Sequence, residues 1–278
     1  MPLLNSWTCI EVGSETWTIW QVNRKGNISV PERITMPTGK LWKLQTMANL
    51  LARSLSGRKI LFLLNISSTI IKLSDSTNSE EFLSGEASVD PVASVTSSAA
   101  SGKILPEDIL TSFAYPIGKQ SADYVFSHNI ERDSIWMTAV PVEISNSLIK
   151  ICRLKSIRPG RVKVIDTVEH RMACYLGRLY PSLWILLPQE PGIRLIVLRE
   201  GAPCGCYFFS NHPDFRVLEL TRLWMCQLDP PQYAVILDES PHYAWLRDFL
   251  EGKSVEFPEP GYKLDFRQAM IGEWIKTL

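Results

Sequence analysis

The sequence lacks the motifs that mark most enzyme active sites. It contains no G-x-x-x-x-G-K-[ST] loop and no G-x-G-x-x-G turn for binding phosphates, and no H-E-x-x-H zinc motif. No two glycines are adjacent anywhere in the chain. Its four histidines are far apart in sequence, so each is expected to be a surface or helix-capping residue rather than a ligand: His128, His170, His212 and His242. We therefore expect no catalytic residue and no enzyme activity.

The chain also lacks an excess of charge and any long apolar run. Lysine plus arginine number 29, and so do aspartate plus glutamate, so no net field attracts nucleic acid or an anionic membrane. The longest apolar runs, 59–66 and 183–187, fall far short of the ~18 residues that cross a bilayer. The first residues do not have the pattern of a signal peptide. We expect a soluble, cytoplasmic protein that contacts a membrane only through a partner.

Cysteine pairs with metal-ligand spacing are missing as well. The six cysteines are scattered, and most lie within apolar runs, where cysteine behaves as a small buried hydrophobe. The only close pair is Cys204-Gly205-Cys206, and a metal site would need at least two further ligands. We expect neither a metal nor another cofactor, although ATP with Mg²⁺ is considered below.

A repeated pattern is the main feature that the sequence does contain. Three short β-rich runs, an amphipathic helix and another apolar run occur in residues 7–65 and again in 182–237. The predicted strands are Trp7–Val12, Thr16–Val22, a short third strand after the turn at 25–27, Lys59–Asn65, and then Leu183–Leu187, Ile193–Leu198, Cys204–Phe209 and Tyr233–Leu237. The pattern predicts an α/β protein with two similar subdomains facing each other.

The two repeats are separated by a stretch that is poor in apolar residues. Nine of the 30 residues in 74–103 are serine, so this segment is predicted to be a disordered insert. We divide the chain into five parts: 1–73, the first part of the first subdomain; 74–103, the insert; 104–165, the remainder of the first lobe; 166–260, the second subdomain; and 261–278, a C-terminal tail.

The region between the repeats contains further predicted elements. Tyr124–His128 and Ser134–Val140 are expected to form an antiparallel strand pair, followed by a helix over 143–155. A short helix is expected near 106–115. Asp166 and Glu169 have the spacing of an N-terminal capping box, which predicts a helix that runs to about Leu179.

The run from Trp136 to Asp166, WMTAVPVEISNSLIKICRLKSIRPGRVKVID, resembles the PilM family. Members of this family are cytoplasmic, actin-like components of type IV pilus assembly platforms. They have a strand, a helix ending in a basic turn, a short strand ending in Asp and another helix. The chain resembles the cytoplasmic half of the type II secretion protein GspL almost as closely as it resembles the PilM family. The resemblance covers most of the chain in the order of its elements, and implies an actin-like (ribonuclease H-like) fold with duplicated subdomains.

The resemblance also implies a partner. A scaffold of this kind would bind a short cytoplasmic N-terminal segment of a bitopic membrane protein in a groove of one subdomain. We expect the groove near the strand pair 124–140 and the helix 143–155, with five apolar side chains that contact the peptide: Tyr124, Phe126, Trp136, Ile144 and Leu148. The segment 264–267 resembles the start of the partner chain, or the segment after the actin-like domain of GspL-like proteins. This suggests a partly fused or rearranged version of the system.

The nucleotide site that the resemblance implies is degenerate in this sequence. Actin-like ATPases bind phosphate at a turn after the first strand, where an acidic residue orients the metal. Here Glu11 replaces the usual Asp, and only Gly13 and Ser14 remain of the turn. The second phosphate turn, at 189–193, lacks the Asp-x-Gly-Gly pattern. The alternative function is a nucleotide-dependent ATPase or a sugar-kinase-like enzyme of the same fold.

The chain contains nine tryptophans, and three of them fall in the first predicted hairpin: Trp7, Trp17 and Trp20. Side chains alternate between the two faces of a strand, so these rings do not all share one face. Core packing is the default expectation for these rings, and the alternative is that at least one of them is exposed, where a tryptophan often marks a contact surface.

Overall fold

The structure is a computed structural model, and its description covers sixteen β-strands and helices with their short connections. The described residues are 7–13, 16–23, 25, 27–29, 31–35, 59–66, 69–75, 124–131, 134–154, 162–189, 192–210, 225, 228–237, 244–258 and 265–278. The amphipathic helix predicted in each repeat and the short helix predicted near 106–115 lie outside these residues, apart from Met225. Most of the serine-rich segment 74–103 also lies outside the described residues.

The first sheet contains the strands of the first repeat. Its order is β3-β2-β1-β4-β8, with β1 and β2 antiparallel and β1, β4 and β8 parallel. The strands are β1 (Trp7–Gly13), β2 (Thr16–Val22), β3 (Glu32–Thr35), β4 (Lys59–Asn65) and β8 (Val162–Thr167). The predicted ranges of β2 and β4 match the structure at both ends.

The second sheet repeats this arrangement. Its order is β11-β10-β9-β12, so β9 to β12 correspond in turn to β1 to β4. The strands are β9 (Leu183–Gln189), β10 (Gly192–Arg199), β11 (Ala202–Ser210) and β12 (Tyr233–Ile236). A parallel bridge from Tyr233 to Glu256 lies where β8 lies in the first sheet. The predicted duplication is therefore confirmed.

A third, smaller sheet is inserted into the first repeat. Its order is β5-β7-β6, and all its pairs are antiparallel. The strands are β5 (Ile70–Asp75), β6 (Tyr124–Glu131) and β7 (Ser134–Pro141). Residues 74 and 75 belong to β5, so the ordered strand continues two residues into the predicted insert. The five-part division by residue numbers otherwise stays a prediction.

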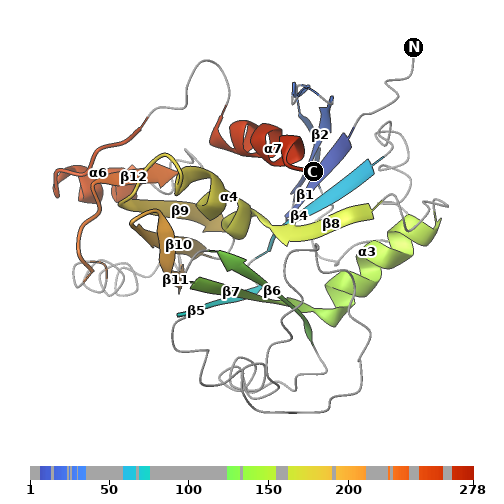
Figure 1. Ribbon diagram of the computed structural model, residues 1–278, viewed down its shortest axis with the longest axis horizontal. Helices are drawn as coiled ribbons and strands as arrows, with labels where there is room; N and C mark the ends of the chain where they lie inside the picture. Colours follow the sequence, from blue (N-terminus) through green and yellow to red (C-terminus); the bar gives the residue numbers. More distant parts are fainter. Residues whose placement is uncertain are drawn as a thin grey trace.

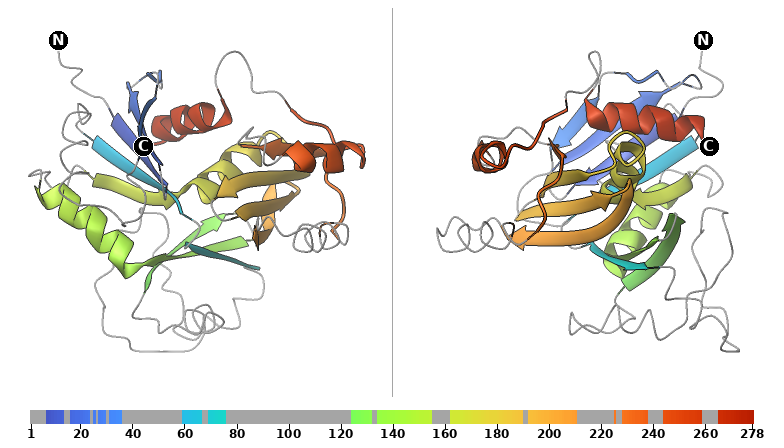
Figure 2. Two further views of the ribbon diagram at one scale, coloured as in Figure 1. Left: turned by 180° about the vertical axis from the view of Figure 1, so that it is seen from behind. Right: turned by 60° about the vertical axis from the view of Figure 1, so that its left-hand side comes forward.

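Helices cover both faces of the first sheet (Figures 1 and 2). On one face, α3 (Val142–Leu154) contributes Ile144, Leu148 and Cys152 to a core with Ile10, Trp17 and other strand residues. On the opposite face lie α4 (Val168–Leu176) and α7 (Phe266–Lys276), which pack side by side. The far face of the second sheet has its own core, which includes Leu246 and Leu250 of α6 (Ala244–Glu251).

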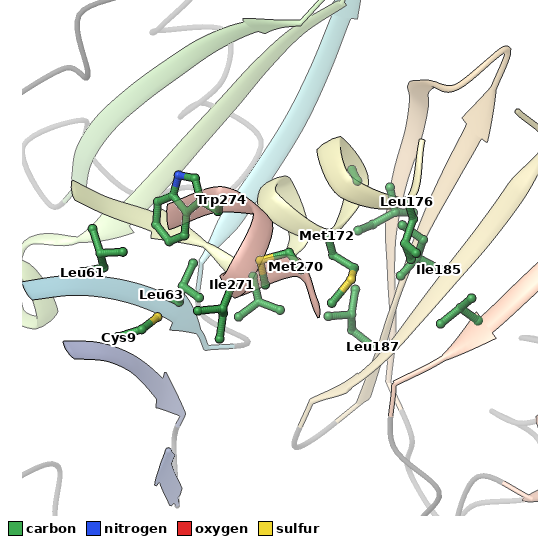
Figure 3. Packing of buried hydrophobic residues seen from close by; sticks show 14 of the residues in the cluster. Cys9, Leu61, Leu63, Met172, Leu176, Ile185, Leu187, Met270, Ile271 and Trp274 are labelled. Carbon is green, nitrogen blue, oxygen red and sulfur yellow. The ribbon is translucent and has the colours of Figure 1, made fainter. Parts of the chain in front are cut away.

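One core joins the two repeats. Figure 3 shows Cys9, Leu61 and Leu63 of the first sheet against Ile271 and Trp274 of α7, and Met172 and Leu176 of α4 against Ile185 and Leu187 of β9. Because α4 and α7 both present apolar side chains to this core, burying them fixes the two sheets relative to each other.

The three tryptophans of the first hairpin are core residues, which was the default expectation, and the alternative of an exposed ring is wrong. Trp7, Trp17 and Trp20 are at most 6% exposed. Trp7 and Trp20 belong to the core shared with α4 and α7, whereas Trp17 belongs to the core under α3. Alternation does place the rings on opposite faces, but helices cover both faces, so all three are buried.

The predicted capping box at the start of α4 is also wrong. The N-cap is Thr167, whose Oγ1 accepts a hydrogen bond from the His170 amide at 3.2 Å, and the helix ends at Leu176. Threonine is an effective N-cap, and its position leaves Asp166 and Glu169 to make ion pairs with other residues. Those ion pairs are described below with the candidate site.

The C-terminal helix is part of the core. Asp265 caps α7, because its carboxylate accepts from the Gln268 amide at 2.7 Å. Met270, Ile271, Trp274 and Ile275 of the helix are buried. Leu264 lies outside the described residues, and the resemblance of 264–267 to a partner segment stays a prediction.

Removing the cap of α7 is expected to destabilise the protein measurably. Asp265→Ala should lower the free energy of unfolding by about 1 kcal/mol, because the first-turn amides lose an acceptor. Asp265→Asn retains an oxygen at the same position and should change the stability little. Urea unfolding of the three proteins measures the difference, and equal losses in both variants would contradict the capping role.

Candidate functional site

The first candidate turn follows β1, where an actin-like ATPase would bind phosphate. Gly13 is the last residue of β1, and a Cβ added there would lie 2.6 Å from the carbonyl oxygen of Thr16. The chain's own hairpin thus requires glycine at this position, with or without a phosphate. Ser14, the third residue predicted for this turn, lies outside the described residues.

Glu11 is the acidic residue of this turn, and its carboxylate is bound by two other side chains. Its Oε1 accepts from Asn65 Nδ2 at 2.6 Å and lies 3.2 Å from Arg267 Nη1. Asn65 ends β4, and Arg267 is in the first turn of α7. The side chain of Glu11 is 5% exposed. The group that would orient a metal is therefore buried and already neutralised by an internal cation.

The second candidate turn joins β9 to β10. Gln189 pairs with Gly192, and residues 190 and 191 lie outside the described part. A Cβ on Gly192 would lie 2.1 Å from the carbonyl oxygen of Phe209 in β11. As at Gly13, contact with a neighbouring strand accounts for the glycine, so neither glycine indicates a phosphate site by itself.

A buried ion pair lies close to the second turn. Arg194 of β10 places Nε 3.1 Å from Glu169 Oε1, and its Nη2 donates to the carbonyl oxygen of Thr69 at 2.9 Å. The side chains of Arg194 and Glu169 are 4% and 0% exposed. Because Thr69 immediately precedes β5, Arg194 connects the second sheet to α4 and to the inserted sheet.

A second buried cluster surrounds the start of α4. The carboxylate of Asp166 lies 3.1 Å from His170 Nδ1 and 2.5 Å from Arg171 Nε, and it also accepts from the Thr167 amide. Burial alone would raise the pKa of Asp166, but His170 and then Arg171 outweigh burial and lower that pKa to about 2. Burial would lower the pKa of His170, but Asp166 outweighs it and raises that pKa to about 10. The sequence predicted that His170 is a surface or helix-capping residue. That prediction is wrong, because the side chain is buried and paired with Asp166.

This pair predicts a pH dependence of stability. His170 has a higher pKa in the folded chain, so its contribution is complete below about pH 6.5 and is lost as the pH rises toward 10. Asp166 has a lower pKa in the folded chain. Its contribution to stability is therefore complete above about pH 3.8 and is lost as the pH falls toward 2. The comparison is made in a Cys174→Ser background, since Cys174 Sγ lies 3.5 Å from His170 Nε2. There the chain with His170 should lose up to about 1.4 kcal/mol per pH unit between pH 6.5 and 10 relative to the same chain with His170→Gln. Urea unfolding across this range checks it, and parallel profiles of the two proteins would contradict it.

The residues predicted to contact a partner are mostly buried. Tyr124 is 9% exposed, Trp136 0%, Ile144 6% and Leu148 1%. Trp136 lies in the core shared by the two repeats, near the His170 ring, whereas Ile144 and Leu148 lie in the core under α3. Phe126 is in β6, but its side chain lies outside the described part. In this conformation the four described side chains support the surface near β6 and α3 rather than forming its exterior.

Several residues of the site were not found from the sequence. Arg267 and Arg194 are separated from their carboxylates by 256 and 25 residues, and no local pattern connects them. By contrast, Asp166, His170 and Cys174 recur every fourth residue, a helical spacing that is visible in the sequence. Among the described residues, no group of three or more His, Cys, Asp or Glu side chains is arranged so that it could hold a metal ion.

The comparisons with known proteins identify the class of fold. No protein-family model matches the sequence, and no curated protein matches it. Among solved structures, the chain is similar to a protein of actin-like ATPase fold and unknown function from Bacteroides thetaiotaomicron, with a TM-score of 0.64, 11% identity and 96% of each chain covered. The chain therefore has the actin-like fold that the repeated pattern and the resemblance predicted.

Two further structures have the particular version of this fold that the sequence resembles. One is the PilM–PilN type IV pilus biogenesis complex, with a TM-score of 0.58, 12% identity, and 96% of this chain and 95% of that chain covered. The other is the cytoplasmic domain of EpsL, an inner-membrane component of the type II secretion system of Vibrio cholerae, with a TM-score of 0.51, 10% identity and 98% and 95% covered. In the described part of the chain, none of the helices is long and apolar enough to span a membrane.

Proposed function

We propose that the protein is a non-catalytic cytoplasmic scaffold of a type IV pilus or type II secretion assembly platform. It binds the cytoplasmic N-terminal segment of a bitopic inner-membrane protein. Support comes from the similarity in fold, over nearly the whole chain, to structures from both kinds of system. The choice between pilus and secretion system depends on the partner and not on the fold, which both share.

The observation that carries the non-catalytic assignment is the ion pair of Glu11 with Arg267. A carboxylate that orients a nucleotide-bound metal must be available to the metal or to its water ligands. Glu11 Oε1 instead faces an arginine and an amide that belong to the fold itself. Releasing the carboxylate would leave Arg267 without this partner, which opposes metal binding.

The surface beside β6 and α3 supports the partner-binding part of the proposal. Among the described strands, β6 pairs on one side only, with β7. An extended peptide binds such a strand through backbone hydrogen bonds, so the buried apolar side chains beneath need not be exposed. Contacts with β6 and β7 place α3 beside this strand. Among the described side chains of α3, four are exposed: Glu143, Asn146, Lys150 and Arg153.

The test is calorimetric titration with synthetic peptides. The peptides are the cytoplasmic N-terminal segments of bitopic membrane proteins encoded beside this chain's gene, with scrambled versions as controls. We expect one of them to bind, and the double variant Lys150→Glu/Arg153→Glu to bind it at least tenfold more weakly. Lys253→Glu/Lys276→Glu, which makes the same charge change on α7 and next to α6, should bind like wild type.

Two results would count against this proposal. If none of the peptides binds the wild-type protein, the scaffold assignment loses its partner. If both double variants weaken binding equally, the effect is one of net charge, and the site is not the surface beside β6 and α3.

A further inference from the structure

Three side chains at the junction of β8 and α4 form a line from a carboxylate to a thiol. Asp166 is in β8, just before the helix, and His170 and Cys174 lie one turn apart on one side of α4. His170 Nδ1 lies 3.1 Å from Asp166 Oδ1, and His170 Nε2 lies 3.5 Å from Cys174 Sγ. The histidine is almost fully buried, whereas Cys174 is partly exposed. The proposed scaffold function makes no use of this arrangement.

The hydrogen bonds of His170 determine which form of the cysteine fits. With its pKa raised to about 10 by Asp166, the imidazole is protonated near neutral pH, and both ring nitrogens are then donors. Nδ1 donates to Asp166, so Nε2 donates toward the sulfur of Cys174. A thiol sulfur is a weak hydrogen-bond acceptor. A thiolate is a strong acceptor, and its negative charge also compensates the positive charge of the imidazolium.

The charge balance around α4 favours the same form. Asp166 carries one negative charge, whereas His170 and Arg171 each carry one positive charge, so these three groups have a surplus of one positive charge. Each nearby described carboxylate is already paired with a cation of its own: Glu169 with Arg194 from β10, Glu11 with Arg267 and Glu273 with Lys276 on α7. A thiolate at Cys174 would balance the surplus.

We propose that Cys174 is a reactive cysteine and a site of oxidative modification, that small peroxides are its substrate class, and that His170 is its positioning residue. The thiolate attacks one oxygen of the peroxide, forming an S–O bond as the O–O bond breaks. Sulfur loses two electrons and becomes a sulfenic acid. With hydrogen peroxide, the departing hydroxide takes a proton from solvent and leaves as water.

The chain provides its own controls among the other described cysteines. Burial raises the pKa of the Cys9, Cys152 and Cys206 thiols. Cys204 is exposed, but partial burial of its sulfur raises its pKa too, and its thiol donates to the carbonyl oxygen of Val197. Cys204 is therefore an accessible cysteine held as a thiol, which is the matched comparison for Cys174.

The experiment measures the labelling rate of each cysteine in the native full-length protein. Iodoacetamide is added at pH 6.5, 7.5 and 8.5, and the chain is then digested with trypsin and analysed by mass spectrometry. Cleavage after Arg171 and Arg178 isolates Cys174 on the peptide 172–178, whereas Cys204 lies on 200–216. A parallel sample receives hydrogen peroxide and dimedone, which labels sulfenic acids.

We expect Cys174 to react at least tenfold faster than Cys204 at pH 6.5. Its rate should change less than about threefold up to pH 8.5, whereas that of Cys204 should rise about tenfold per pH unit, as thiols do below their pKa. Dimedone should label 172–178. In His170→Gln, the Cys174 rate at pH 6.5 should fall at least tenfold and should then rise with pH.

The wild-type pH profile tests the proposal even if His170→Gln fails to fold. The proposal is overturned if Cys174 is labelled no faster than Cys204 at pH 6.5, or if its rate rises with pH as steeply. It is also overturned if peroxide and dimedone leave 172–178 unlabelled, or if folded His170→Gln retains the wild-type rate and profile.

Discussion

Arg194→Met is expected to lower the free energy of unfolding by about 3–5 kcal/mol, because it leaves the carboxylate of Glu169 buried without its cation. The two side chains are 4% and 0% exposed, and Arg194 also donates to the Thr69 carbonyl oxygen. For a chain of this length, such a loss corresponds to a fall in Tm of roughly 10 °C. Thermal and urea unfolding of the purified variant measure it.

Two further variants show whether the ion pair itself is responsible. The double variant Glu169→Met/Arg194→Met removes both charges and should recover most of the stability, since paired buried charges are often replaceable by apolar side chains. Arg199→Met removes an arginine from the same strand, where its pair with Asp229 is 63% and 85% exposed, and it should have little effect. A double variant less stable than Arg194→Met would contradict this explanation.

Trp274→Ala is expected to have a comparable effect, lowering the free energy of unfolding by about 3–5 kcal/mol. Trp274 is 6% exposed and lies in the core formed by α7, α4 and both sheets, with the guanidinium of Arg171 4.6 Å from its ring centre (Figure 3). Truncation removes this packing and leaves a cavity between the two repeats. Urea unfolding gives the change in free energy.

The control for this variant lies in the same C-terminal segment. Leu278 is 49% exposed, so Leu278→Ala should change the free energy of unfolding by less than about 0.5 kcal/mol. If both substitutions have small effects, the C-terminal helix is not an integral part of the core.

The fold was largely predictable from sequence because its strands are short, β-rich and bounded by turns. The bounds of β2 and β4 agree with the prediction, and the repeated order of strands correctly indicated two similar sheets. Exposure was harder to predict: an exposed ring in the first hairpin stayed an alternative, because the burial of a side chain such as Trp17 depends on which helices cover each face of a sheet. That covering involves α3, more than a hundred residues away in the chain.

The candidate site was predictable only in part. Glu11 and Gly13 were found because the turn they belong to is local. What determines the chemistry of Glu11 is its contact with Asn65 and Arg267, which come from distant elements. Likewise, the capping box assigned to Asp166 and Glu169 was a sound local pattern, but Thr167 provides the cap, and both carboxylates pair with cations instead. Long-range ion pairs leave no periodic signal in a single sequence.

Titration of the wild-type protein with Mg-ATP tests the central claim most directly. If Glu11 is held by Arg267 and Asn65, 1 mM Mg-ATP should produce no heat of binding and should leave Tm unchanged within 1 °C. An intact site with a Kd near 10 μM would be saturated a hundredfold at that concentration and would stabilise the fold by about 2.7 kcal/mol. A Tm increase of several degrees that disappears in Glu11→Gln would contradict the account.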